Sequence, residues 1–459
     1  MKDKTKLVLK RILGSILFLA ILLGVLSYAM FVTKRKNSDE KYADFFNQKE
    51  DFDILFFGSS RVLNGVYPME LWDDYGFVSY NFGGHGNYIP VSYWVWRNTM
   101  DYTKPKLVVI DTYYIEENNP YRENTQQMHI STDAFPLSKT KYEMVEDLFG
   151  DEASDFHKNR NEFLFNFGSY HDRWSELTEK DFVVKPTPEK GAEMRVDVAK
   201  GLEPSWYRES EREDMTGWTE DSIAKMYLRQ WIKDCQDQGI EVLLVYLPHA
   251  AEKYQQDYSI GVQQIADEMG VNYLNLLYED TVQYDTDFYD LDGHLNPSGA
   301  HKVTDKIGEY IKENYDIPNR KRDENYSKWW DDYEKYKEYK VEILKSQKYL
   351  ETYLMLCNDS DFDVTVEINN NSVLMEDRTV RHLVENLVES VEVMNCANEI
   401  KYVNDDSWYY DMQIVVRYTG TDEIVDGARF TIDSGIKPSD EALDNAIFYA
   451  NEDYIRINY

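Results

Sequence analysis

"DILFFGSSR" (residues 53–61) is the stretch of sequence that decides the fold. Four apolar residues stand between an aspartate and a glycine, which is the pattern of a short strand buried on both faces. The serines that follow are typical of a helix start, where a side-chain oxygen accepts hydrogen bonds from free backbone N–H groups. We therefore predict a strand that passes into a helix through a sharp turn, with Ser60 at that turn.

Strands and helices alternate after this turn. Apolar runs and segments with helical spacing follow each other at residues 106–115, 219–238, 240–248, 256–269, 271–276 and 296–315. The last of these is predicted to be a helix with Asn296 as its N-cap and Pro297 in its first turn. Such alternation indicates a parallel sheet covered by helices on both faces, so residues 53–317 are predicted to form an α/β domain.

Other segments flank or interrupt this domain. Residues 37–52 are expected to form a short polar stalk, and the polar, aromatic stretch 120–218 is an insertion of the kind that forms a lid or a substrate wall. Residues 318–349 are charged and Tyr-rich, which predicts a connecting helix. Residues 350–459 are predicted to form a small, separate α+β module. Its expected strands lie at residues 361–368, 412–419 and 428–433.

Residues 12–33 contain no charged side chain and are predicted to cross a membrane. A helix of this length covers about 33 Å, enough for a hydrocarbon core of roughly 30 Å. A cleaved signal peptide is the alternative, but its apolar region is usually shorter, about 7–15 residues, and no good cleavage site follows here. Five basic residues precede the span and three follow it, which favours an N-terminus inside and an extracytoplasmic body. Residues 1–36 are thus expected to be a cytoplasmic tail and a single-pass signal anchor in the plasma membrane.

The charge of the chain is large and unevenly divided. The 459 residues carry a formal net charge of −34, but the first 36 carry +7, which leaves −41 for the remainder. An acidic body argues against a nucleic-acid partner, which requires a basic surface, and suits neutral or cationic partners or solubility alone. The three cysteines show no CxxC pattern and therefore predict neither a metal centre nor a disulfide framework.

Two further motifs supply what a serine nucleophile needs. "NFGGHGNY" (81–88) is glycine-rich, so either its backbone N–H groups approach a ligand closely or it is an ordinary turn. "FYDLDGHLNPSG" (288–299) places His294 just before a helix and close to Asp290 and Asp292. A histidine beside a carboxylate can activate a serine hydroxyl, and the alternatives are a structural histidine or a metal site. For the serines of the first motif the alternative role is a helix cap.

In this order the three motifs resemble the SGNH hydrolase superfamily over about residues 50–317. "FFGSSR", "HLNPSGA" and "YHDRW" (170–174) are similar to a branch of membrane-anchored Gram-positive proteins. These are similar to the D-alanyl transfer protein of lipoteichoic acid synthesis and to alginate O-acetyltransferases. The resemblance implies a three-layer, flavodoxin-like α/β fold, serine chemistry and no cofactor.

The resemblance also implies a role for each matched residue. Ser60 is the expected nucleophile, His294 is its base, and Asp290 orients the base, with Asp292 as the alternative. The backbone N–H groups of Ser60 and Gly86 are expected to form the oxyanion hole.

Two features depart from the family pattern. The family's third block supplies an Asn as an oxyanion donor, but the strand "LVVID" is followed here by "TYYIEENN". Asn81, Tyr113 or Tyr114 is therefore considered as the missing donor. In addition, Asp290 lies four residues before His294 instead of three, a spacing that a one-residue bulge in the loop would repair.

Five residues are candidate substrate contacts. Arg61 follows the nucleophile and either holds an anion or braces the helix start. His249 lies at the carboxyl end of a predicted strand, where open α/β sheets bind ligands. His171, Arg173 and Trp174 either line an acceptor site or pack the insertion itself.

The resemblance and the predicted anchor indicate an extracytoplasmic serine O-acyltransferase or esterase that acts on a cell-envelope glycopolymer through acyl-Ser60. A membrane-bound O-acyltransferase is the partner expected to deliver the acyl group. The alternatives are a non-catalytic envelope scaffold, or a glycan- or partner-binding protein, on a degenerate SGNH fold, and a secreted lipase.

Overall fold

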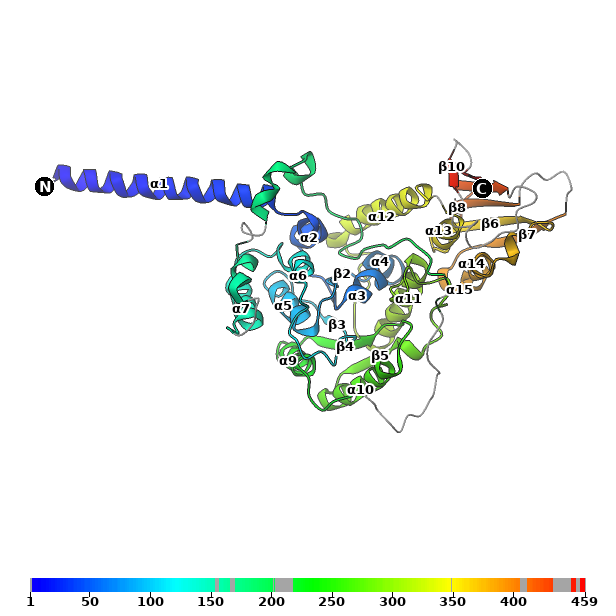
Figure 1. Ribbon diagram of the computed structural model, residues 1–459, viewed down its shortest axis with the longest axis horizontal. Helices are drawn as coiled ribbons and strands as arrows, with labels where there is room; N and C mark the ends of the chain where they lie inside the picture. The colour runs from blue at the N-terminus through cyan, green and yellow to red at the C-terminus, as the bar shows by residue number, and fades with distance from the viewer. Residues whose placement is uncertain are drawn as a thin grey trace. The chain divides into compact units, whose positions relative to one another are not determined.

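The computed structural model describes residues 2–152, 157–165, 170–200, 202, 218–347, 349–404, 411–431, 447–450 and 455–458. The chain forms two compact units (Figure 1). One comprises residues 1–47 and 124–187, and the other comprises residues 48–123 and 188–459. The stretch expected to be one insertion at 120–218 is thus divided between the two units.

The first unit contains the apolar N-terminal helix. Its elements are α1 (Lys2–Thr33), α2 (Asn37–Asn47), α6 (Thr125–Thr132), α7 (Lys139–Phe149) and the short 3₁₀ helices η1 (His157–Phe163), η2 (His171–Ser175) and η3 (Glu179–Phe182). Within α1, residues Thr5–Thr33 are long and apolar enough to cross a membrane. Residues 37–47, expected in a polar stalk, are helical instead because Tyr42 and Phe45 share one buried face that packs toward α6.

The second unit is built on a five-stranded parallel sheet. Its strands are β1 (Ile54–Phe57), β2 (Ser79–Asn81), β3 (Leu107–Asp111), β4 (Glu241–Tyr246) and β5 (Asn272–Asn275), in the order β2-β1-β3-β4-β5. This is the flavodoxin-like order of an open, doubly wound sheet. The prediction of a parallel α/β sheet is therefore confirmed.

Two groups of helices cover this sheet. Helices α3 (Ser60–Gly65) and α4 (Pro68–Tyr75) pack against α11 (Pro297–Asn314), while α9 (Ile223–Asp237) packs against α5 (Ile89–Thr99) and α10 (Lys253–Met269) (Figure 1). Aromatic rings fill the layer between sheet and helix: Phe57 of β1 lies edge-on to Trp231 of α9, with ring centroids 5.5 Å apart. Burial of such rings is the main source of stability in this layer.

The C-terminal part of the second unit holds a six-stranded mixed sheet in the order β10-β11-β9-β8-β6-β7. Its strands are β6 (Phe362–Asn369), β7 (Glu399–Val403), β8 (Met412–Tyr418), β9 (Ile424–Thr431), β10 (Ile447–Ala450) and β11 (Ile455–Asn458). Alternate residues of β6 are buried and share a hydrophobic core with α13 (Leu350–Leu356) and α14 (Arg378–Glu389), which α15 (Val391–Met394) follows. The predicted α+β module is confirmed, although residues 432–433 of its third expected strand lie outside the described residues.

Helix α12 (Lys328–Lys345) lies within the segment predicted as a connecting helix. Trp329 of this helix is buried, and its ring lies 5.4 Å from Trp72 of α4 and 6.1 Å from Phe52. The helix therefore packs against the α/β domain.

Candidate active site

The two serines in the turn after β1 have different roles. Ser59 is the N-cap of α3: its Oγ accepts a hydrogen bond from the Arg61 N–H at 3.2 Å and donates one to Asp111 Oδ2 at 2.9 Å. Ser60 is the first residue of the helix and has no capping role. The capping alternative therefore applies to Ser59, and the hydroxyl of Ser60 remains available for chemistry.

The backbone of this turn approaches the end of β3 closely. A Cβ on Gly58 would lie 2.4 Å from the Cβ of Asp111 and 2.8 Å from Cγ2 of Val62, so only glycine fits. Asp111 is buried, and desolvation raises the pKa of its carboxyl. The sequence reasoning did not assign a role to Asp111, although a carboxylate at the carboxyl end of a central strand was a signal that could have found it.

Ser60, His294 and Asp290 form a chain of hydrogen bonds. Ser60 Oγ lies 2.8 Å from Nε2 of His294, and Nδ1 of His294 lies 2.8 Å from Oδ2 of Asp290. The backbone N–H of His294 also donates to Asp290 Oδ1 at 3.1 Å. Burial opposes ionisation of Asp290, but the hydrogen bonds from His294 lower the pKa of its carboxyl below the usual value. Asp290 is thus kept as a carboxylate next to the imidazole.

The loop that carries these two residues accommodates the four-residue spacing with a turn. Phe288 and Leu295 pair as an antiparallel bridge, and the Gly293 N–H donates to the Asp290 carbonyl at 3.2 Å. Gly293 has φ +80°, a conformation that favours glycine. The turn brings Asp290, and not Asp292, against His294. The carbonyl of Asp292 instead accepts a hydrogen bond from Arg61 Nη2 at 2.9 Å.

The glycine-rich turn 81–88 carries Gly86, whose N–H was expected to form the oxyanion hole together with that of Ser60. The glycine-rich turn docks beside the nucleophile turn, because the Gly84 N–H donates to the Gly58 carbonyl at 3.0 Å. Within the described residues, neither the Ser60 nor the Gly86 N–H donates a hydrogen bond. Neither N–H group is thus committed to a backbone carbonyl within the described residues, which is a condition for the predicted oxyanion hole.

Of the side-chain donors considered for the oxyanion hole, Asn81 is engaged elsewhere. Asn81 is buried, its Nδ2 donates to the carbonyls of Val62 and Val66 at 2.7 Å each, and its Oδ1 accepts from the Gly83 N–H at 2.8 Å. Both N–H bonds of its amide are used, so Asn81 holds α3 and is not a free donor. The Tyr113 hydroxyl accepts a hydrogen bond from Gln255 Nε2 at 3.2 Å, a contact that does not use its own O–H.

Arg61 joins α3, which begins at Ser60, to the loop that carries Asp290 and His294. Its guanidinium is buried and donates to the carbonyls of Gly293 at 2.5 Å and Asp292 at 2.9 Å. The guanidinium carbon also lies 4.1 Å from the ring centroid of Tyr113. Of its two expected roles, the structure supports a brace between the two halves of the site.

His249 was expected to contact a substrate, but it is only 1 % exposed. Its Nδ1–H donates to the Leu247 carbonyl at 3.2 Å, and its ring lies edge-on to Tyr113. Burial, together with the positive charge of Arg61, lowers the pKa of His249 well below its usual value. His249 is therefore a neutral, buried histidine that packs against Tyr113 and has almost no surface open to a substrate.

The remaining substrate candidates lie in the first unit, whereas Ser60 and His294 lie in the second. Arg173 donates to the carbonyl of Thr33, the last residue of α1, at 2.7 Å and to Asp181 Oδ1 at 2.8 Å. Trp174 is 73 % exposed. The side chain of His171 lies outside the described residues. The guanidinium of Arg173 is therefore committed to the end of α1 and not to a substrate.

The segment 190–199, which begins in a turn, connects the two halves of the site through backbone hydrogen bonds. The Glu193 N–H donates to the Leu63 carbonyl of α3 at 3.0 Å, and the Ala199 N–H donates to the Phe288 carbonyl at 2.8 Å. We call this segment the strap. It was predicted only as part of a larger insertion, because hydrogen bonds of the main chain leave little trace in sequence.

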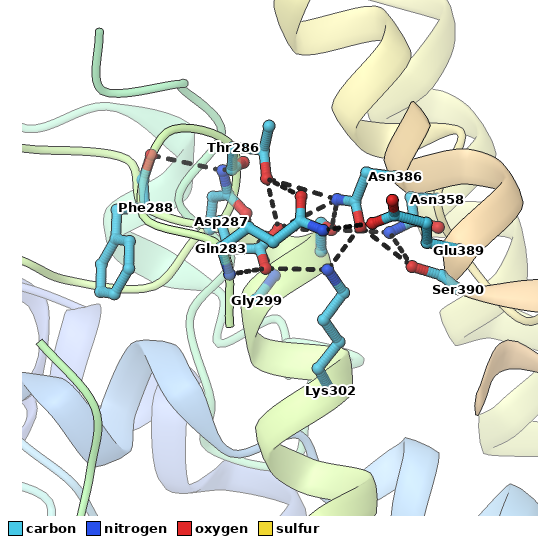
Figure 2. A network of polar contacts seen from close by, with 12 residues as sticks. Gln283, Thr286, Asp287, Phe288, Gly299, Lys302, Asn358, Asn386, Glu389 and Ser390 are labelled. Atoms are coloured by element: carbon cyan, nitrogen blue, oxygen red, sulfur yellow. Dashed lines mark hydrogen bonds and ion pairs between the residues drawn. The ribbon is translucent and has the colours of Figure 1, made fainter. Parts of the chain in front are cut away.

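The C-terminal module also holds the loop of the base (Figure 2). Asp287, three residues before Asp290, is buried, and its Oδ2 lies 2.8 Å from Lys302 Nζ. Asn386 of α14 bridges both partners: its Oδ1 lies 2.6 Å from Lys302 Nζ and its Nδ2 lies 3.2 Å from Asp287 Oδ1. At the edge of this network Gln283 Nε2 donates to Glu389 Oε2 at 2.7 Å. The module predicted as separate is thus attached directly to the segment that leads to Asp290.

A second set of buried contacts, made by charged groups, attaches the C-terminal module to the α/β domain. Glu70, His301 and Asp359 lie close enough to share a metal ion. However, Lys340 Nζ lies 3.2 Å from Glu70 Oε1 and 2.8 Å from Asp359 Oδ1, so an ammonium group already compensates these carboxylates. We call these four residues, together with Asp361, the Lys340 cluster. It ties α4, α11 and α12 to the start of the C-terminal sheet.

No protein-family model matches the sequence, and no curated protein matches it either. Among solved structures, the chain is similar to that of a "putative acylhydrolase" from Bacteroides fragilis NCTC 9343. The two are 10% identical, with a TM-score of 0.31, and the match covers 61% of this chain and 98% of that chain. The similarity between the two chains is therefore distant.

Proposed function

We propose that this protein is a serine-dependent O-acyltransferase or esterase that works through an acyl-Ser60 intermediate. The observation that carries the proposal is the chain from Ser60 Oγ to His294 Nε2 at 2.8 Å and from His294 Nδ1 to Asp290 at 2.8 Å. A nucleophile, a base within hydrogen-bond reach and a carboxylate that orients the base are the parts that acyl transfer to serine requires.

The geometry supports a two-step mechanism. Ser60 Oγ attacks the acyl carbonyl while His294 Nε2 takes its proton, and the Asp290 carboxylate stabilises the imidazolium. The negative charge on the former carbonyl oxygen is accepted by the N–H groups of Ser60 and Gly86. The bond to the leaving alcohol then breaks, and the alcohol receives the proton from His294. In the second step a hydroxyl of the acceptor, or water, loses its proton to His294 and attacks the acyl carbonyl; the bond to Ser60 Oγ then breaks, and Ser60 Oγ receives the proton from His294.

The expected setting is the outer face of the plasma membrane. The span Thr5–Thr33 supports a single-pass anchor, and the excess of basic residues before it supports an N-terminus inside. The resemblance in sequence motifs supports a cell-envelope glycopolymer as the acceptor and a membrane-bound O-acyltransferase as the partner that supplies acyl groups. The strong negative charge of the body disfavours a polyanionic nucleic acid as its ligand.

A second candidate function is a non-catalytic envelope scaffold or a glycan-binding protein. The observation that favours it is the state of Asn81, whose amide is fully used within the fold. Asn81 is then unable to serve as the side-chain oxyanion donor, and the loss of one donor typically costs about 10²–10³ in rate.

Covalent labelling with a fluorophosphonate probe tests the proposal. The native chain is expected to be labelled, Ser60→Ala is expected to remain unlabelled, and Ser346→Ala, which changes an exposed serine at the end of α12, is expected to behave like the native chain. Acylation by a small activated ester, detected as an increase in intact protein mass, provides the same comparison if the site is too narrow for the fluorophosphonate. Equal modification of native chain and Ser60→Ala contradicts the assignment of the nucleophile. No modification of any variant by either reagent favours the scaffold.

A further inference from the structure

Large apolar side chains are exposed beside the end of α1. Trp174 is 73 % exposed, Phe182 is 49 % exposed and Val183 is 53 % exposed. We call these three residues the collar. Scattered exposed apolar residues are ordinary, but a group that includes a tryptophan and a phenylalanine indicates an interaction surface.

The collar is fixed to the last turn of α1. Both η2, which contains Trp174, and η3, which ends at Phe182, pack against α1. Arg173 donates one hydrogen bond to the Thr33 carbonyl at 2.7 Å and another to Asp181 at 2.8 Å. Because Trp174 follows Arg173 and Phe182 follows Asp181, this bonded pair places the collar beside the helix end.

The length of α1 gives the depth at which the collar would lie. The uncharged stretch 12–33 covers about 33 Å as a helix, and a hydrocarbon core is roughly 30 Å thick. Thr33 therefore lies at the boundary between acyl chains and headgroups if α1 spans the bilayer. Tyr28 and Phe31 stack near this end of α1, with ring centroids 6.4 Å apart. Aromatic residues at this level are typical of membrane proteins.

We propose that the collar is a membrane-docking surface, and that Trp174, Phe182 and Val183 enter the interfacial region of the leaflet in which α1 ends. The occupant is lipid, at the boundary between headgroups and acyl chains, because the collar continues directly from the end of a helix that is itself suited to lipid. Trp and Phe partition well into this region, and an indole N–H stays close to water there. The proposal rests on α1 as a membrane span and is independent of the chemistry of Ser60.

Site-specific fluorescence on the full chain in phosphatidylcholine nanodiscs tests the proposal. Single cysteines at positions 174 and 182 are labelled with the polarity-sensitive dye NBD, while the buried native Cys235, Cys357 and Cys396 are left in place. Leu17→Cys, in the middle of α1, is the reference for the hydrocarbon core. Tyr402→Cys, 60 % exposed on β7 of the second unit, is the matched control for an exposed aromatic residue outside the unit that contains α1.

The expected result is a blue-shifted emission at positions 174 and 182, with stronger quenching by lipids spin-labelled near the headgroup than by lipids labelled deep in the chain. Position 17 should show the reverse order, and position 402 should show neither effect. Positions 174 and 182 that behave like position 402 overturn the proposal. The same holds if position 17 is not quenched, or if quenching at 174 requires a co-reconstituted membrane-protein fraction, which would make a protein the occupant. None of these readouts depends on acyl transfer, so failure here is distinguishable from failure of the proposed function.

Discussion

The proposed nucleophile, Ser60, and its proposed base, His294, are held in place by different kinds of structure. Ser60 is positioned locally, by the β1–α3 turn, by the close approach of Gly58 to the end of β3, and by the bond between Ser59 and Asp111 at 2.9 Å. His294 lies in a loop that depends on distant parts of the chain. The supports of that loop are the Arg61 guanidinium, the strap and Asn386 of α14. The base side should therefore respond to mutations far from the site, and the nucleophile side should not.

The two carboxyl groups, Asp111 on the Ser60 side and Asp290 on the His294 side, differ in burial and in the direction of their pKa shifts. Asp111 is buried, and desolvation raises the pKa of its carboxyl, which serves as a hydrogen-bond acceptor within the fold. Asp290 is partly exposed, and His294 lowers the pKa of its carboxyl despite desolvation. The different surroundings of the two carboxyls thus set their pKa values in opposite directions.

The largest effect is expected at Asp290. Replacing it with Asn removes the charge that stabilises the imidazolium and allows the wrong tautomer of His294, which in serine enzymes costs about 10⁴ in rate. Asp292→Asn is the matched control, since only the backbone carbonyl of Asp292 contacts the site. The measurement is the rate of Ser60 acylation by an activated ester. Equal losses in the two variants would remove Asp290 from its assigned role.

A smaller effect is expected when the brace between the two sides is cut. Arg61→Met keeps much of the side-chain volume but loses both hydrogen bonds to the base loop. A displacement of about 1 Å between reacting groups costs about 10² in rate. Arg229→Met, on the exposed face of α9, is the control for the loss of an arginine and should leave the acylation rate unchanged. Normal acylation in Arg61→Met would show that the loop holds its position without the brace.

The C-terminal module offers a comparison of its two attachments. Asn386→Leu leaves Lys302 and Asp287 without their shared partner, so we expect about a tenfold slower acylation, equivalent to about 1.4 kcal/mol.

Lys340→Met breaks the Lys340 cluster, which does not include the base loop in the described structure. It should lower the free energy of unfolding by about 3–5 kcal/mol and leave the acylation rate of the folded protein unchanged. Acylation rates at low temperature and urea unfolding separate the two outcomes, and a slower rate in Lys340→Met alone would reverse the assignment.

The difference between the two sides also explains what sequence could predict. Apolar runs indicated β1, β3, β4 and β5, but β2 is only three residues long and has no apolar pattern. The proposed roles of Ser60, His294 and Asp290 could be inferred from sequence because they depend on side chains in short motifs. The strap was not found, since it acts through main-chain groups that any sequence supplies. Asn386 was not found either, because an amide on a helix 92 residues after His294 gives no sign of what it contacts.

The smallest expected effect is the contribution of Asp290 to stability at different pH. Its folded-state pKa is lowered relative to the usual value of about 3.9, so its stabilising contribution is present above about pH 4 and is lost as the pH falls through the folded-state pKa. The difference in free energy of unfolding between native chain and Asp290→Asn should therefore shrink from about pH 6 to about pH 3. Because Asp290 is partly exposed, we expect a change of only about 0.5 kcal/mol, measurable from urea midpoints in detergent with Asp292→Asn as the control. A difference that grows toward low pH would mean that His294 does not hold Asp290 in its charged form, and the base side would then lack the electrostatic support that distinguishes it from Asp111.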